Sequence, residues 1–347
     1  MHKPLLMGIA ITLSATLLFA NGVVETQSNT DSDTSKSITV YAHDSFCSDW
    51  GPGPELVKAF EDKTGIQVDL VSAGSTGEMI SRLAIEKDNP QADVIVGISD
   101  DMAPLAYQAD ILSSYHSPTL SSLDPSFLFD PLDRLIPFEY SNYGFVYDSE
   151  KISEDQLPKS LQDLTKPQYK DKVILIDPRT SSAGLGLLIW TIEVYGEDGY
   201  LTWWKAMKEN ALTIAGSWSS AYGAFTEGEA PMVISYTTSP VYHVINENTT
   251  RYRALIFDEG HATTIEALGL SKTCHDRASS EAFIEFVLND AQLKVAVNDA
   301  SYPVNNKTPL PDAYKWAPKP KKLSIDGNVI NKKLNSWLDA WTKAMTE

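Results

Sequence analysis

Short apolar runs alternate with helical patterns over the first hundred residues of the chain. Apolar and β-branched side chains dominate residues 38–41, 66–71 and 92–97, which predicts strands there. Apolar positions three and four residues apart predict helices at 54–63 and 77–87. Strand, helix and strand in this order form the unit of a parallel sheet, so the N-terminal part of the chain is predicted to be α/β.

The middle and the end of the chain continue this alternation. Residues 137–147 are aromatic and extended, which predicts a strand that crosses from one lobe to another. A second α/β region is predicted to begin with a strand at 173–176, and the chain is strand-like again at 263–271. Further helices are predicted at residues 184–195, 201–209, 278–288, 290–297 and 330–345.

An almost uncharged apolar run lies between Pro4 and Ala20, directly after Lys3. A basic residue followed by such a run is typical of a secretory signal peptide, which we place at residues 1–20. The run is short for a stable membrane span, and an uncleaved anchor is the alternative. Residues 21–37 are rich in Ser, Thr and Asp and predict a flexible leader. We therefore expect the mature protein outside the cytoplasm, after cleavage of the signal peptide.

Length and charge restrict the functions that the chain can have. Its 347 residues suit two domains of ordinary size. The formal net charge of -18 argues against nucleic acid or an anionic membrane as a partner, because both require Lys and Arg patches. The same charge is compatible with a cationic ligand. Cys47 and Cys274 show no spacing pattern, so a disulfide and two free thiols both remain open.

The usual sequence signatures of enzymes are absent from the chain. It has no G-x-S-x-G elbow, no complete G-x-G-x-x-G, no phosphate-binding loop that ends in Gly-Lys-Ser/Thr, and no H-E-x-x-H. The six histidines are scattered, so each is expected to be an ordinary polar or packing residue. We therefore expect no catalytic residue, no metal and no cofactor.

Clusters of Ser and Thr precede two of the predicted helices. Ser75 and Thr76 stand before the helix at 77–87, and Ser181 and Ser182 stand before the helix at 184–195. Free N–H groups and the positive end of the helix dipole make such positions suitable for an anion. Plain N-capping uses the same residue types and is the alternative. Two such clusters, together with the segment from Ser235 to His243, favour a binding cleft.

The segment from Ser235 to His243 brings hydroxyls and phenols together after an apolar run. The hydroxyls can donate and accept hydrogen bonds, and the phenol rings offer faces for a flat or cationic ring. The alternative is a Pro-punctuated turn whose Ser and Thr cap the next segment. The candidate ligand residues of this segment are Tyr236, Thr237, Thr238, Ser239 and Tyr242.

Trp218 stands before a predicted helix start, among small hydroxyl residues that leave its face open. It is either a stacking plate for a cation or a buried staple. The loop after the first strand carries Asp44 and Asp49, which could balance a positive ring or only form turns. Open α/β sheets bind ligands at the carboxyl ends of their strands, where this loop is expected to lie.

Several motifs, in one order along the chain, give it a resemblance to a known family. They are Asp44-Ser45-Phe46, Asp49-Trp50-Gly51-Pro52-Gly53-Pro54, Asp177-Pro178-Arg179-Thr180-Ser181, Gly184-Leu185-Gly186-Leu187-Leu188, Trp218-Ser219 with Ala221-Tyr222-Gly223, and Ser235-Tyr236-Thr237-Thr238-Ser239-Pro240. Together they resemble the periplasmic thiamine-binding proteins of ABC importers. The resemblance implies a monomeric, two-lobed type II periplasmic binding-protein fold. Such a protein closes over thiamine or a thiamine phosphate in its interdomain cleft and then docks on the permease subunits.

The resemblance also implies positions for the lobes and the ligand. Lobe I would cover residues 38–140, lobe II residues 141–264, and the return to lobe I with the C-terminal helices residues 265–347. The departures from the family pattern are His43, where relatives have a tyrosine, and Ser75-Thr76, where relatives have an acidic residue and a glycine. The ligand contacts carried over are Ser75, Thr76, Ser181, Ser182, Trp218, Tyr236, Thr237, Thr238 and Ser239, with Tyr242 as an additional ring.

Functions of another class remain as alternatives. Thiamine-degrading enzymes with a cysteine nucleophile resemble this fold, and Cys47 lies in a loop that could face the ligand. A sister binding protein for ferric iron would need anionic phenolates and carboxylates around one point, of which Tyr236 and Tyr242 are a partial set. A polyamine-binding protein would need several carboxylates with aromatic rings in its cleft.

Overall fold

The computed structural model describes residues 36–323 and 325–347 of the chain. The signal peptide expected at residues 1–20 lies outside the described residues, as does all of the expected leader except residues 36 and 37. Within the described part, no helix is both long enough and apolar enough to cross a membrane.

The strands and helices begin and end close to the predicted positions, and each predicted element is present in the described part of the chain. The strands are β1 (Ser37–Ala42), β2 (Gln67–Ser72), β3 (Val94–Ser99), β4 (Leu112–Ser113), β5 (Leu135–Asp148), β6 (Val173–Ile176), β7 (Thr213–Ala215), β8 (Met232–Tyr236), β9 (Tyr252–Ala254), β10 (His261–Ser271), β11 (Tyr302–Pro303) and β12 (Lys322–Leu323). The helices are α1 (Asp44–Cys47), α2 (Gly53–Thr64), α3 (Thr76–Glu86), α4 (Ala103–Ala109), α5 (Ser182–Asn210), α6 (Trp218–Glu227), α7 (Pro240–Asn246), α8 (Arg277–Asn289), α9 (Gln292–Asn298) and α10 (Gly327–Thr346).

The helices predicted at residues 184–195 and 201–209 are joined in α5. Gly196 interrupts this helix with a φ of 68° and a ψ of 174°, which is a kink between its two halves. Glycine adopts a positive φ at little steric cost, so the chain changes direction there without a loop.

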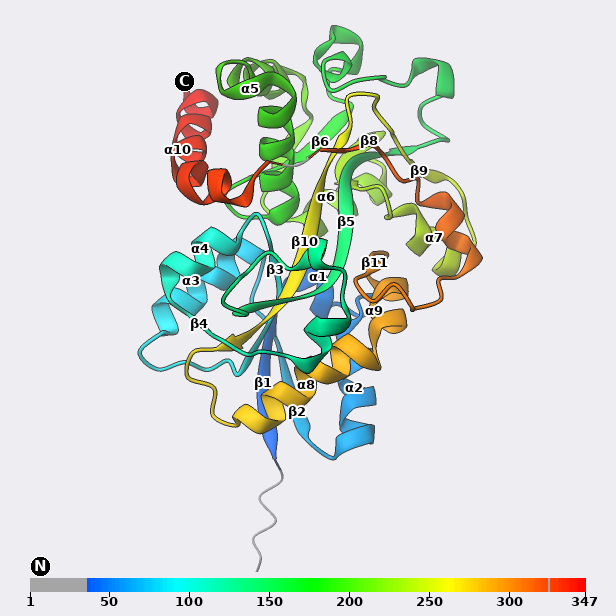
Figure 1. The fold of residues 1–347 in the computed structure, drawn as a ribbon. Helices are drawn as coiled ribbons and strands as arrows, with labels where there is room; N and C mark the ends of the chain where they lie inside the picture. The colour runs from blue at the N-terminus through cyan, green and yellow to red at the C-terminus, as the bar shows by residue number, and fades with distance from the viewer. Residues whose placement is uncertain (1–35, 324) are drawn as a thin grey trace, which may run out of the picture. The chain divides into compact units, whose positions relative to one another are not determined.

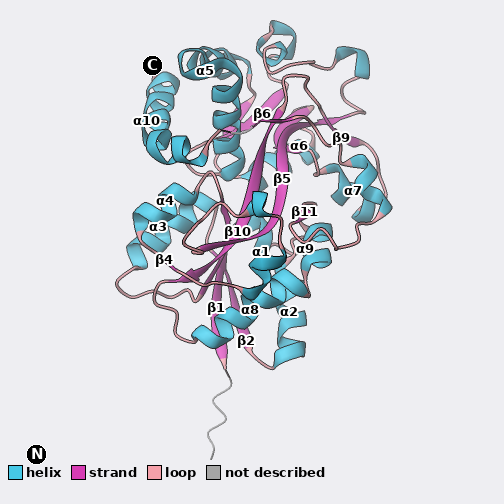
Figure 2. Ribbon diagram, viewed as in Figure 1, coloured by secondary structure: helices cyan, strands magenta, loops and turns pink. Residues whose placement is uncertain are grey.

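The strands follow the order β2-β1-β3-β10-β5-β8-β6-β7. β1 is parallel to both β2 and β3, and β6 is parallel to both β7 and β8. Between these two parallel sets lie β10 and β5, which are antiparallel to each other and to their outer neighbours β3 and β8. Figure 1 shows β5 and β10 side by side along the middle of the molecule, and Figure 2 shows the helices around the strands.

β5 exchanges its partner along its length. Its residues up to Asn142 pair with β10, and its residues from Tyr143 onward pair with β8. The strand predicted to cross between two regions therefore does connect two sets of strands. The lobe limits expected at residues 140 and 264 remain a prediction.

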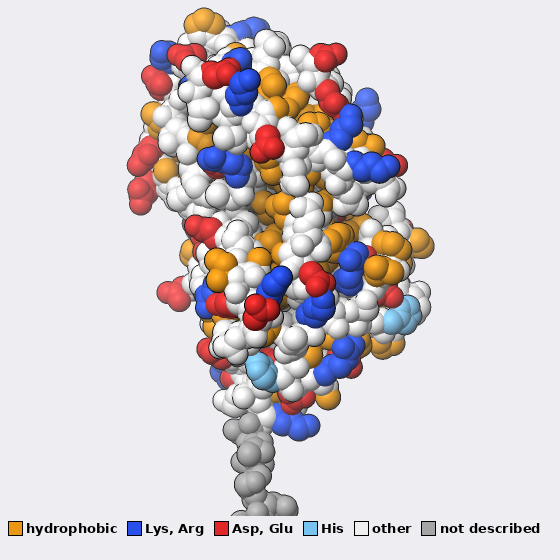
Figure 3. All heavy atoms as spheres, turned by 90° about the vertical axis from the view of Figure 1, so that its left-hand side faces the viewer, with side chains coloured by type: hydrophobic (Ala, Val, Ile, Leu, Met, Phe, Trp, Pro, Cys, Tyr) orange, Lys and Arg blue, Asp and Glu red, His pale blue; other side chains and the backbone are white. Residues whose placement is uncertain are grey.

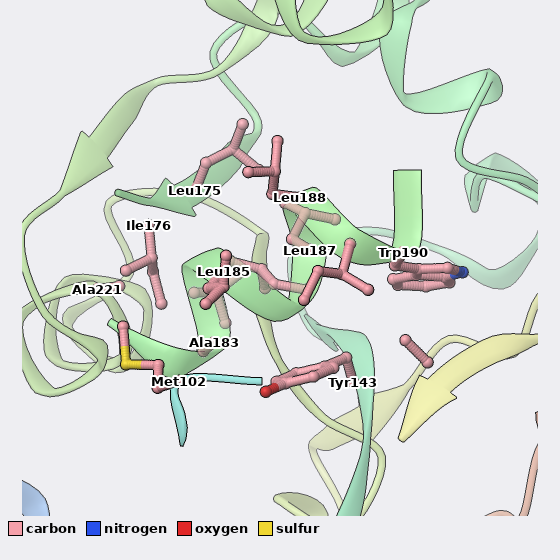
Figure 4. Packing of buried hydrophobic residues seen from close by; sticks show 14 of the residues in the cluster. Met102, Tyr143, Leu175, Ile176, Ala183, Leu185, Leu187, Leu188, Trp190 and Ala221 are labelled. Carbon is pink, nitrogen blue, oxygen red and sulfur yellow. The ribbon is translucent and has the colours of Figure 1, made fainter. Parts of the chain in front are cut away.

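The core is built from strands that are buried on both faces. All six residues of β3 and all four residues of β6 are buried, as expected for strands covered by helices on each side. Figure 4 shows how Leu185, Leu188 and Trp190 of α5 pack near Leu175 and the ring of Tyr143.

α5 lies very close to β5 at one point. A Cβ atom on Gly186 would lie 2.0 Å from the ring of Tyr143, so only glycine fits at this place in the helix. The C-terminal helix α10 packs on α5, with Trp341 in edge contact with Trp204 at a ring distance of 5.5 Å.

The surface carries charges of both signs. On the face shown in Figure 3, Lys and Arg side chains are interspersed with Asp and Glu, and hydrophobic side chains gather across the middle. Among the described residues, this face has no continuous basic field of the kind that nucleic-acid-binding proteins show.

Asp148 at the end of β5 forms a partly buried ion pair with Arg251. Its side chain is fully buried and accepts hydrogen bonds from Nε and Nη2 of Arg251 at 2.8 and 2.6 Å. Burial raises the pKa of Asp148, but these hydrogen bonds lower it more, so the folded pKa lies below the ordinary value. The pair therefore stabilises the fold above about pH 4, and this contribution is lost as the pH falls through the folded pKa.

We expect Asp148→Asn to lower the free energy of unfolding by about 2 kcal/mol at neutral pH, because charge-assisted hydrogen bonds are lost. Urea unfolding of the wild type and the variant measures this difference, which should shrink at about pH 2. Glu154→Gln removes the partner of the exposed Arg253 and is the control, with an expected change below about 0.5 kcal/mol. An equal difference for Asp148→Asn at both pH values would contradict the assignment.

Candidate functional site

A cavity of about 280 Å³ opens among the ends of several elements. Its walls come from the loop after β1, the first residues of α3, α5, α6 and α7, the inner strands β5 and β10, and the residues after α9. The carboxyl end of β1 therefore lies at the cavity, as expected for an α/β sheet. No single segment of the chain supplies more than a part of the wall.

Nine of the ten predicted ligand residues line this cavity, although they come from four separate segments. Thr237 is the exception: it is fully buried and its backbone N–H donates to the carbonyl of Asn142 at 2.9 Å. A Cβ atom on Gly144 would lie 2.9 Å from the Thr237 methyl group, so this side chain packs toward β5. The nine lining residues are Ser75, Thr76, Ser181, Ser182, Trp218, Tyr236, Thr238, Ser239 and Tyr242.

The segment from Ser235 to His243 is a turn and a cavity wall at the same time. β8 ends at Tyr236 and α7 begins at Pro240. Within the turn, the hydroxyls of Ser235 and Ser239 lie 2.8 Å apart, and the hydroxyl of Thr238 lies 2.7 Å from that of Ser141 on β5. These bonds hold the turn in place, and Tyr236, Thr238 and Ser239 still face the cavity.

The start of α3 is an ordinary capped helix end. Both the backbone N–H and the hydroxyl of Ser75 donate to the carboxylate of Glu78 at 2.8 Å, and the N–H of Gly77 donates to the carbonyl of Thr180 at 2.9 Å. The hydrogen bonds from Ser75 lower the pKa of Glu78. The anion at this helix end is thus the protein's own carboxylate, so N-capping describes it better than anion binding.

The start of α5 has no capping hydrogen bond from the side chain of its N-cap residue. Ser181 is this N-cap residue, and both Ser181 and Ser182 line the cavity. The chain turns tightly here, since a Cβ atom on Gly184 would lie 2.5 Å from the carbonyl oxygen of Asp177. Two hydroxyls at a helix N-terminus can hold an oxygen-bearing group of a ligand.

Aromatic rings form another wall of the cavity. Trp218 stacks on Tyr222 with a centroid distance of 4.7 Å, and its indole N–H donates to Ser235 at 2.8 Å. Trp50 lies 5.8 Å from the ring of Trp218 and 6.4 Å from that of Tyr242. Trp218 is therefore both a packed side chain and part of the cavity surface. Trp50 and Tyr222 were not among the predicted ligand residues.

A set of acidic side chains was also missed by sequence reasoning. Glu139 of β5, Glu266 of β10 and Asp299 after α9 line the cavity together with His43. Glu139 and Glu266 stand directly opposite each other in the antiparallel pair. For Glu139 and Glu266, the signal in the sequence was a carboxylate in the interior of a strand that is otherwise mostly apolar or uncharged, apart from Asp148 at the end of β5.

Burial dominates the electrostatics of this acidic wall. Desolvation, followed by the charges of Asp299 and Glu266, raises the pKa of Glu139 well above its ordinary value. Desolvation and the charge of Glu266 also raise the pKa of Asp299. Burial lowers the pKa of His43, but the hydrogen bond and charge of Glu266 raise it more, to about 9. His43, Glu266 and Asp299 place polar atoms within 4.8 Å of one another, which makes them the candidate cation ligands of the described residues.

Cys47 does not line this cavity. It follows Phe46 in α1, and both cysteines are free. Burial, together with the charge of Asp44, raises the pKa of the Cys47 thiol to about 12. A thiol with such a pKa is almost entirely protonated at neutral pH, so it is a poor nucleophile.

Comparisons with known proteins agree with this architecture. A family model for bacterial extracellular solute-binding proteins matches residues 55–322. The thiamine-binding periplasmic protein of Brucella melitensis is 34% identical over 310 residues, covering 88% of this chain and 91% of its own. The thiamine-binding periplasmic protein of Escherichia coli is 33% identical over 311 residues, covering 89% of this chain and 93% of its own.

A solved structure shows the same fold. A periplasmic thiamin binding protein superposes with a TM-score of 0.83 at 32% sequence identity, covering 90% of this chain and 96% of its own. The expected α/β fold of the type II periplasmic binding proteins is confirmed. The chain belongs to the bacterial extracellular solute-binding proteins and, within them, to the family of the thiamine-binding periplasmic proteins.

Proposed function

We propose that this protein captures thiamine in the periplasm and delivers it to the permease of an ABC importer. The observation that carries the proposal is one cavity that combines aromatic rings, hydroxyls and carboxyl groups, in a chain whose relatives bear the name thiamine-binding periplasmic protein. Thiamine has a flat aminopyrimidine, a cationic thiazolium and a hydroxyethyl tail, so each kind of wall has a counterpart in the ligand.

The cationic ring of the ligand fits the aromatic wall. Trp218 and Tyr242 come from α6 and α7, whereas Trp50 comes from the loop before α2. A ring bound among these side chains would contact α6 and α7 on one side and the loop before α2 on the other. Binding would then favour a closed conformation over an open one. Such a population shift would report the occupied state to the permease.

The tail of the ligand fits the start of α5. The hydroxyls of Ser181 and Ser182 are suited to the hydroxyethyl group, or to a phosphate on it, because a helix N-terminus favours oxygen ligands. We propose that the protein works as a monomer that carries one ligand molecule in this cavity. We also propose that Ser75 and Thr76 contribute shape rather than an anion site, since Glu78 already occupies the N–H and hydroxyl of Ser75.

A ferric iron site is less consistent with the cavity. Burial and the nearby Glu266 raise the pKa of Tyr236 well above its ordinary value, and burial raises that of Tyr242, so an iron ion would have to displace both phenol protons against this cost. Catalysis by Cys47 is likewise not part of the proposal, because its thiol lies outside the cavity wall and remains protonated.

Trp218→Ala tests the aromatic wall. We expect it to weaken thiamine binding about fivefold, because a stacking contact with a cationic ring contributes about 1 kcal/mol. Isothermal titration calorimetry with thiamine measures the loss. Trp316→Ala removes a tryptophan that does not line the cavity and should leave the affinity unchanged. An unchanged affinity in Trp218→Ala would mean that Trp218 only packs against Tyr222, and no heat with thiamine in the wild type would end the proposal.

Cys47→Ala separates transport from catalysis. The variant should bind thiamine as the wild type does, and neither protein should consume thiamine in the presence of a competing nucleophile. At about pH 8, iodoacetamide should alkylate Cys47 much more slowly in the folded than in the urea-unfolded protein, because the folded thiol is almost fully protonated. Thiamine turnover that disappears in Cys47→Ala would establish an enzyme instead.

A further inference from the structure

The acidic wall places two carboxyl groups where a sheet does not normally accept them. Glu139 and Glu266 are directly opposite in the register of β5 and β10, and two ionised carboxylates in this position would destabilise the sheet. Asp299 lies beside them, and Ser301 donates to Glu139. The fold therefore keeps a costly arrangement at the centre of its cavity, which is typical of a functional site rather than of a structural one.

Polar atoms of the same wall lack partners. Thr264 Oγ1 is buried and has no hydrogen-bond partner among the described residues, and the buried His43 Nε2 and Glu266 Oε2 make no close hydrogen bond beyond the long contact between them. His43 is 7% exposed and Thr264 is 1% exposed, and both line the cavity. His43 Nε2 points toward Glu266, with 3.4 Å between Nε2 and Oε2. Buried donors and acceptors without partners cost free energy, so these atoms await a ligand with complementary groups.

The position of the proton on the His43 ring bears on whether the wall suits a metal ion or a cation that donates hydrogen bonds. Its Nδ1 accepts the backbone N–H of Phe46 at 3.2 Å and lies 2.7 Å from the hydroxyl of Ser45. A neutral imidazole whose Nδ1 accepts a hydrogen bond carries its proton on Nε2, and a protonated imidazole carries one there too. A metal ion at Nε2 would first have to displace this proton. The wall is thus suited to a cation that donates hydrogen bonds to carboxylates.

The charge of the whole cavity agrees with this choice. Neither Lys nor Arg is among the lining residues of the described chain. The lining carboxyl groups are those of Asp44, Glu139, Glu247, Glu266 and Asp299. A hydrogen-bond-donating nitrogen cation would offset like-charge repulsion and satisfy acceptors at the same time.

We propose that Glu139, Glu266 and Asp299 bind the aminopyrimidine end of thiamine, with the amino group and a protonated ring nitrogen donating to carboxylate oxygens. This inference rests on the proposed function and adds the orientation of the ligand: the aminopyrimidine lies at β5 and β10, and the tail points toward α5. The amino group and the ring nitrogen that takes up a proton lie on opposite sides of the pyrimidine, so each can donate to a different carboxylate of the wall. His43 acts as a positioning residue, because its Nε2–H faces the oxygen of Glu266.

Thiamine and oxythiamine, which has an oxygen in place of the amino group, provide the test. Calorimetric titration of the wild type should show thiamine binding at least about tenfold more tightly, since the analogue leaves a carboxylate unpaired. In Glu266→Gln or Glu139→Gln this preference should fall to about threefold or less, because an amide accepts and donates equally well. Glu281→Gln removes a charge outside the cavity and should keep the full preference.

Thermal unfolding of the ligand-free proteins provides a second readout. Glu139→Gln should melt at the same temperature as the wild type or higher, because the repulsion between facing carboxyl groups is removed while the His43–Glu266 pair is kept. If one of the two glutamine variants does not fold, Asp299→Asn serves in the titration instead.

The possible outcomes separate the two levels of the proposal. An undiminished thiamine preference in the folded variants would overturn the aminopyrimidine assignment and leave thiamine transport in place. Thiamine affinity that requires Zn²⁺ and disappears with EDTA would also overturn it, by assigning the wall to a metal ion. Failure of the wild type to bind either ligand would overturn the proposed function together with this inference.

Discussion

The antiparallel pairing of β5 with β10 is the interaction on which the rest of the structure depends. These two strands hold the parallel strands β1–β3 on one side and β6–β8 on the other, and β5 exchanges partners at Tyr143. β5 and β10 connect the set β1–β3 with the set β6–β8. A ligand that lies on these two strands can therefore contact elements of both sets. The cavity is consequently a product of the topology.

Most polar groups around the cavity have two roles. Ser235 accepts from the indole of Trp218 and lies within hydrogen-bond distance of Ser239, so the hydroxyls first build the turn that places the rings. Ser75 is occupied by Glu78, which closes a helix end that would otherwise attract an anion. Packing and recognition are therefore not alternatives here, because the same hydrogen bonds that stabilise the turns also fix the directions of the side chains that face the cavity.

The carboxyl groups of the acidic wall lower the stability of the fold at the cavity. Glu139 and Glu266 face each other across two central strands, in a region where burial raises the pKa of Glu139 well above its ordinary value. Replacing such groups with neutral ones commonly stabilises a protein, so their presence points to selection for binding rather than for stability. The capped helices, the buried strands β3 and β6 and the Asp148–Arg251 pair supply stability elsewhere.

The sequence by itself determined the α/β alternation, the positions of the helices and strands, and nine of the residues that line the cavity. The elements follow from local rules, because periodicity shows which face is buried and Ser and Thr before a helix mark its start. The cavity residues follow from the resemblance to the family together with the hydroxyl and aromatic clusters of the sequence. Only the tertiary structure decided that Glu139, Glu266, Asp299 and His43 meet, and that Thr237 points away. The physical reason is that strand register and chain return set these distances. Contacts between residues more than a hundred positions apart leave no periodic signal in either segment.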